Sequence, residues 1–131
     1  MGNIAYEGKI FDEQLQPVIR HLRNGLQNTE DERMMVNTIS TISNLLRHND
    51  ANVQELISSG VMKRAMELFG NPSSSKILMY LMSMMKKAVK YEQFVEVYSK
   101  ESINTMLEYL ISQGLCDSRS DEVLNLKNKL R

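Results

Sequence analysis

The chain has 131 residues, of which 42% are hydrophobic and 24% charged, and its sixteen Lys and Arg residues balance sixteen Asp and Glu residues. This composition indicates one folded domain with a substantial core rather than a disordered segment. Without an excess of positive charge, general binding to a nucleic acid backbone is disfavoured. No hydrophobic run approaches the roughly 20 residues of a membrane-spanning helix, so the sequence predicts no integral membrane segment.

A lone cysteine, Cys116, leaves the chain without an internal disulfide, and no cluster of Cys or His has the spacing of metal ligands. The sequence therefore predicts no bound metal or cofactor and indicates a reducing compartment. We expect a cytoplasmic protein, and a nuclear location stays open.

Residues 1–10 contain two glycines and little periodicity, so we expect a flexible lead-in. The start MGNIAY is similar to the N-myristoylation pattern through Gly2, although that pattern has Ser or Thr where this chain has Tyr6. An acylated Gly2 would make the chain a membrane-peripheral adaptor.

From residue 11 onward the sequence predicts only helices, because apolar residues recur at spacings of three and four and no long segment alternates apolar with polar residues. The first helix is LQPVIRHLRN. It is followed by NTEDER, where Asn28 or Thr29 is expected to cap a longer helix that ends near His48. After the break HNDAN and the short helix VQELISS, Gly60 is expected to adopt a left-handed conformation before VMKRAMELF.

The break GNPSSS opens a second round of helices. A helix that contains KILMYLMSMMKK runs to about Lys90, and the helices YEQFVEVYS and SINTMLEYLIS follow it before Gly114. Residues 116–131 are expected to form a capped amphipathic helix that covers a neighbour or docks on a partner.

The order of long, short and medium helices therefore occurs twice. A shift of 41 residues pairs apolar or aromatic side chains of the two rounds: Val53, Leu56, Ile57, Met62, Met66 and Phe69 pair with Phe94, Val97, Tyr98, Ile103, Leu107 and Leu110. A period near 40 is typical of helical solenoids, in which each unit buries its apolar side on the next.

The stretch TISTISNLLRHNDANVQELISSGVMKRAMELF resembles an armadillo repeat, above all in Asn44 within ISNLL and Gly60 within SSGVM. The resemblance implies an all-α fold, a right-handed armadillo-like solenoid of about two to three repeats over residues 11–115. In that family the Asn that matches Asn44 lies on the concave face and binds the main chain of extended peptides. Lys86 stands at the Asn position of the second repeat, and Met82 stands four residues before it.

The resemblance assigns one side of the two long helices to a concave face, and six residues on that side are candidates for binding a protein: Asn37, Ser40, Asn44, Met79, Met82 and Lys86. Met84 and Met85 belong to the apolar stripe of their helix and are expected in the core. For Met79 and Met82 three interpretations stand: packing inside the chain, adaptable packing against a partner, or soft-metal binding, for which no Cys or His lies nearby.

Lys86, Lys87 and Lys90 form the one concentrated basic patch in the sequence. Favourable interaction with the negative end of a helix dipole accounts for them, and the functional alternative is attraction of an acidic partner segment.

The sequence predicts that the chain is not an enzyme. His21 and His48 lie on separate segments without a nucleophile in a recognisable setting, and Cys116 has no signature of a reactive thiol.

The predicted function is thus that of a non-catalytic scaffold or adaptor, which binds a partner peptide or helix on its concave face. The alternative is a structural subunit that self-associates or docks through the solenoid ends, because a stack of few repeats leaves apolar end surfaces uncovered.

Overall fold

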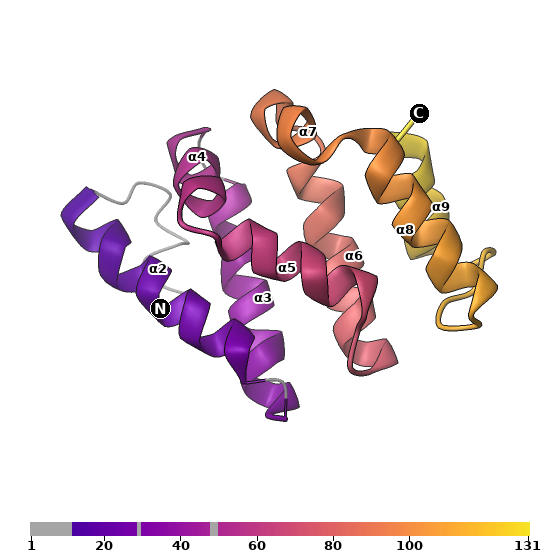
Figure 1. The fold of residues 1–131 in the computed structure, drawn as a ribbon, viewed down its shortest axis with the longest axis horizontal. Helices are drawn as coiled ribbons and strands as arrows, with labels where there is room; N and C mark the ends of the chain where they lie inside the picture. Colours follow the sequence, from indigo (N-terminus) through magenta and orange to yellow (C-terminus); the bar gives the residue numbers. More distant parts are fainter. Residues whose placement is uncertain (1–11, 29, 48–49) are drawn as a thin grey trace.

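The computed structural model describes residues 12–28, 30–47 and 50–131, and within them all regular structure is helical, as the sequence predicted (Figure 1). The expected lead-in over residues 1–10 and the acylation of Gly2 lie outside the described residues. No helix in the described part of the chain has both the length and the apolar character needed to cross a membrane. The described residues contain eight helices: α2 (Asp12–Gln27), α3 (Glu32–Leu46), α4 (Asp50–Ser58), α5 (Val61–Gly70), α6 (Ser75–Ala88), α7 (Glu92–Tyr98), α8 (Lys100–Ser112) and α9 (Asp121–Lys129).

The helices are arranged in two layers with two short helices at one end (Figure 1). Helices α2, α5 and α8 lie side by side in one layer, and α3, α6 and α9 lie side by side in the other. The short helices α4 and α7 pack against each other at the end where α3 and α6 terminate. Helices α2 to α6 thus each pack against the helix three elements further along the chain.

Nine of the twelve paired apolar positions of the two rounds are buried, and Ile57 and Tyr98 are half-buried. Val53, Met62 and Phe69 are fully buried in the first round, and Phe94, Ile103 and Leu110 are fully buried in the second. Burial of each such side chain stabilises the fold by about 1.5–3 kcal/mol relative to its exposure.

Val97 is the exception among these pairs. Its counterpart Leu56 is 0% exposed, whereas Val97 is 57% exposed. Helix α4, which carries Leu56, packs against α7, but within the described residues no later helix continues this row beyond α7. The outer side of α7 is therefore an end surface.

Within the described residues, side-chain caps start four helices, and one cap differs from the expectation. Helix α3 is capped by Asp31, whose carboxylate accepts a hydrogen bond of 3.0 Å from the Met34 amide. The predicted cap was Asn28 or Thr29; Asn28 lies further upstream, and Thr29 lies outside the described residues. Ser74, Ser99 and Ser120 cap α6, α8 and α9 in the same way.

Backbone conformation also marks the junction between the short and medium helices. Gly60 precedes α5 with a φ angle of 87°, which confirms the left-handed conformation expected there. In the second round the single residue Ser99 joins α7 to α8 with a φ angle of 46°, although a side chain disfavours positive φ. Ser99 also caps α8, and this hydrogen bond offsets part of the strain.

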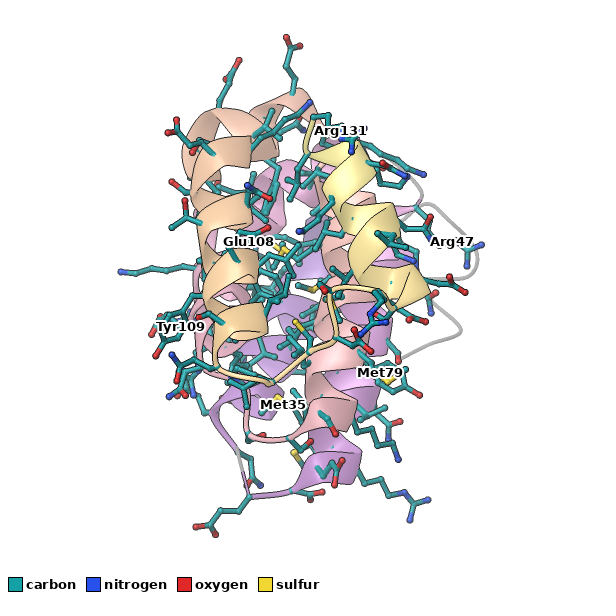
Figure 2. The ribbon with its side chains drawn as sticks, turned by 90° about the vertical axis from the view of Figure 1, so that its right-hand side faces the viewer. Met35, Arg47, Met79, Glu108, Tyr109 and Arg131 are labelled. Carbon is teal, nitrogen blue, oxygen red and sulfur yellow. The ribbon has the colours of Figure 1, made fainter. Side chains whose placement is uncertain are left out.

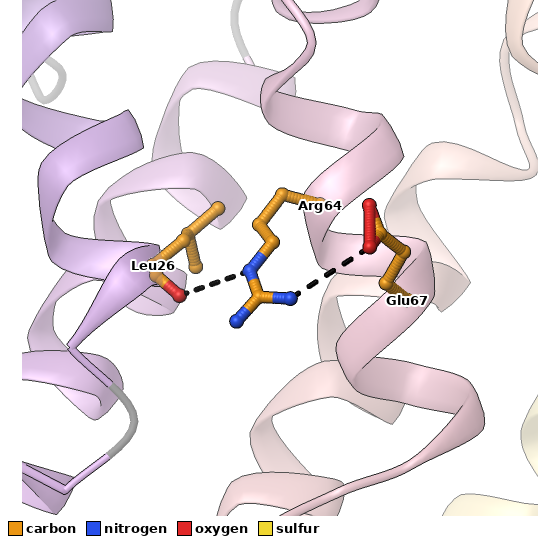
Figure 3. A network of polar contacts seen from close by, with 3 residues as sticks. All are labelled: Leu26, Arg64 and Glu67. Carbon is orange, nitrogen blue, oxygen red and sulfur yellow. Dashed lines mark hydrogen bonds and ion pairs between the residues drawn. The ribbon is translucent and has the colours of Figure 1, made fainter.

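Carbonyls near the C-terminal ends of α2 and α3 are bound by side chains from later segments of the chain. The Arg64 guanidinium on α5 donates to the Leu26 carbonyl of α2 at 3.2 Å and lies 3.7 Å from the Glu67 carboxylate (Figure 3). The Asn52 amide on α4 donates to the Leu45 carbonyl of α3, and the Tyr91 hydroxyl donates to that of Leu46. Carbonyls at helix ends lack partners inside their own helix, so these bonds satisfy them and fix α2 and α3 in place.

Candidate interaction surface

Asn37, Ser40 and Asn44 of α3 line one hollow beside that helix. Its volume is about 570 Å³, and its other lining residues are His21, Leu22, Asp31, Arg33, Met34, Thr38 and Thr41. The structure therefore brings the three predicted α3 residues together.

The amide groups of Asn37 and Asn44 are available to a ligand. Asn37 is exposed and Asn44 is half-buried. In the described part of the chain, neither side-chain amide forms a hydrogen bond, although the main-chain carbonyl of Asn37 accepts one from Thr41. A side-chain amide offers both a donor and an acceptor, so each can bind the main chain of another polypeptide.

Of the three predicted residues of α6, Met79 and Lys86 reach the molecular surface, but neither lines the hollow beside α3. Met79 is 51% exposed and Lys86 is half-buried. They lie seven residues apart, which places them on the same face of the helix. Figure 2 shows Met79 on the same side of the molecule as Arg47, which follows the last residue of α3.

Met82 is located in the core. Its exposure is 2%, and it belongs to the same apolar cluster as Met84 and Met85, which are fully buried as expected. Met82 therefore packs inside the chain, which was the first of its three interpretations, and it is not available to a partner.

A second hollow connects α3 with the beginning of α6. Its volume is about 500 Å³, and it is lined by Glu32, Arg33, Val36, Asn37 and Lys76. Asn37 and Arg33 line both hollows, so the two are adjacent. We call Asn37, Ser40, Asn44, Met79 and Lys86 the α3–α6 surface.

Met34 is a further member of this region that the sequence analysis did not select. It is 40% exposed and lines the first hollow. The sequence could have indicated Met34 through its position three residues before Asn37, because residues 34, 37, 41 and 44 share one helix face.

The environment of Cys116 disfavours its thiolate form. Cys116 is half-buried, and burial raises the pKa of its thiol, with the carboxylates of Asp117 and Glu108 acting in the same direction and Lys127 opposing them. A thiol with a raised pKa is a weak nucleophile at neutral pH. Among the described residues no group of three or more His, Cys, Asp or Glu side chains is placed to hold a metal ion.

The α3–α6 surface is thus made of amide, hydroxyl, thioether and ammonium groups on two neighbouring helices. Compared with known proteins, the chain matches no family model, no curated protein and no solved structure.

Proposed function

We propose that this chain is a non-catalytic protein-interaction module that holds a peptide or helix of a partner on the α3–α6 surface. The observation that carries the proposal is the pair of unengaged amides, Asn37 and Asn44, at the hollow beside α3. Two such groups seven residues apart on one helix face can bind two points along a partner main chain.

The other groups of the surface supply complementary contacts. Met79 and Met34 are exposed, and the flexible thioether side chain packs against partners of varied shape. Lys86 carries a positive charge that would meet an acidic side chain. Hydrogen bonds from the two amides would set the position of the partner main chain along the surface, and the methionines would supply apolar contact area.

We also propose that the helices form a right-handed armadillo-like solenoid, with α3 and α6 on its concave side. Support for this comes from the packing order, in which the rows α2, α5, α8 and α3, α6, α9 each advance by three elements. The repeated apolar positions at a shift of 41 residues agree with the same arrangement.

Replacement of both Asn37 and Asn44 by Ala should weaken peptide binding by about tenfold, since each lost hydrogen bond is worth about 0.5–1.5 kcal/mol. Ligands would be selected from a phage-displayed random peptide library on the immobilised chain, and their affinities measured by fluorescence anisotropy. The matched control replaces Asn104 and Asn125, two exposed residues of α8 and α9. Failure to select any peptide, or equal affinity of both double variants, would contradict the proposal.

A second candidate function is self-association through the end of the helix stack, which the 57% exposure of Val97 favours. Val97 occupies a position that is fully buried in the first round, so a second copy could cover it. Light scattering at the highest soluble concentration should then show a dimer, and Val97→Glu should return the mass of a monomer. A monomer at every concentration would eliminate this candidate.

A further inference from the structure

Five cations from three helices meet at one edge of the molecule. Arg47 follows the last residue of α3, Lys86 and Lys87 lie in the last turn of α6, Lys90 lies just after α6, and Lys129 ends α9. Helices α3, α6 and α9 pack side by side and run in the same direction, so their C-terminal ends share the edge beside α7 (Figure 1). We call these five residues the terminal cation cluster.

The cations of the cluster repel one another. Burial lowers the pKa of Lys129, and the neighbouring Lys90 and Lys86 lower it further. Burial lowers the pKa of Lys87, and the neighbouring Arg47, Lys86 and Lys90 lower it further. The dipole of a helix favours a cation near its C-terminus. It does not explain why five cations from three helices lie close enough to repel one another.

No carboxylate of the described residues neutralises this charge. The ion pairs in that part of the chain join Arg64 to Glu67 and Lys127 to Glu108, and neither includes a member of the cluster. Because the whole chain has a formal net charge of zero, the cluster is a local concentration of positive charge. An anion bound between Lys90 and Lys129 would remove their repulsion.

We infer that the terminal cation cluster binds an acidic segment of the partner protein, in which several carboxylate or phosphate side chains are spaced along the chain. This inference rests on the proposed function, because it specifies the chemistry of the same partner. The cluster shares Lys86 with the α3–α6 surface, so a peptide on that surface reaches the cluster directly.

The form of the cluster selects this kind of ligand. Helix C-termini present carbonyls rather than amides, so they cannot enclose a single phosphate as a helix N-terminus does. The cations instead reach the ligand through flexible side chains from separate helices, which suits several spaced anionic groups. Glu92 and Glu96 of α7 lie at the same end of the molecule, and neither forms an ion pair with a member of the cluster.

Replacing Lys90 and Lys129 together by Ser should weaken the binding of a fluorescein-labelled glutamate-rich peptide by about tenfold in fluorescence anisotropy. Raising the salt concentration from about 0.05 M to about 0.3 M should weaken binding to the unmodified chain, because it shortens the Debye length. The matched control replaces Lys63 and Arg119, two exposed cations elsewhere, with the same change in net charge. If the Lys90 and Lys129 variant loses its helical circular dichroism, Arg47→Gln with Lys90→Gln replaces it in the same test.

Equal affinity of the cluster variant and its control would overturn the inference. So would tighter, cluster-dependent binding to vesicles of phosphatidylcholine and phosphatidylserine, or to a single-stranded oligouridine, than to the acidic peptide. The Asn37 and Asn44 double variant separates the two proposals. If the acidic peptide needs the cluster but not these amides, the inference stands and the proposed α3–α6 surface is wrong. If the selected peptides need the amides but not the cluster, the proposed surface stands and the inference is wrong.

Discussion

Gly25→Ala is expected to destabilise the fold by about 1–3 kcal/mol, the usual cost of forcing extra volume into a packed core. A Cβ atom at this position would lie 2.2 Å from the Thr38 hydroxyl oxygen and 3.0 Å from its methyl carbon. Thr38 cannot easily turn away, because it is buried and its hydroxyl donates to the Met34 carbonyl at 2.8 Å. Alanine favours helix over glycine by at most about 1 kcal/mol, which does not offset the clash. Urea unfolding followed by circular dichroism measures the change.

Two further variants test this explanation. Thr38→Ala removes the two closest atoms and should recover part of the stability lost in Gly25→Ala, so the double variant should be more stable than the sum of the single changes predicts. Gly70→Ala is the matched control, because its new Cβ atom would meet only the flexible Met106 methyl group at 2.9 Å. A similar loss for Gly25→Ala and Gly70→Ala would show that the approach of α2 to α3 is not the cause.

Met82→Ala should destabilise the fold by about 2–5 kcal/mol, the range found for truncation of large apolar core residues. Met79→Ala, three residues earlier on the same helix, should change the free energy of unfolding by less than about 0.5 kcal/mol, as expected of a surface substitution. The difference follows from exposures of 2% for Met82 and 51% for Met79. Urea denaturation of both variants decides the matter.

In contrast to its small effect on stability, Met79→Ala should have a clear effect on binding. Met79→Ala removes a flexible side chain of the α3–α6 surface, and we expect weaker affinity for the selected peptides without loss of stability. Equal destabilisation by Met79→Ala and Met82→Ala would mean that both side chains lie in the core.

The position of Met82 shows what the sequence could and could not provide. Spacing within one helix separated the stripe of Met84 and Met85 from the side of Met79 correctly. Met82 lies at the boundary between these two sides, and such a residue is exposed or buried according to whether a neighbouring helix flanks that boundary. Helix α9 packs against α6, and its placement depends on contacts between segments far apart in the sequence.

Local patterns predicted the helices and their breaks well, because capping residues and apolar spacing act within a few residues. Gly60 and the repeated order of the helices are examples. The cap of α3 was harder to assign, since NTEDER contains several side chains able to accept a hydrogen bond, and only the geometry selects Asp31. The terminal cation cluster could not be assembled from the sequence, because Arg47 and Lys129 join the lysines of α6 only through parallel packing of α3, α6 and α9.

The carbonyls at the ends of α2 and α3 have a consequence for how the molecule unfolds. A chain built of two similar units can lose one unit while the other persists, and helix ends usually fray first. The hydroxyl of Tyr91, in the second round, donates a hydrogen bond to the Leu46 carbonyl at the end of α3. The Arg64 guanidinium donates one to the Leu26 carbonyl of α2, which lies 38 residues earlier in the chain. Opening of the α3 end breaks a bond to the second round, and opening of the α2 end breaks a bond to the first round. The leading helix and the two rounds are therefore coupled and should melt in a single cooperative transition.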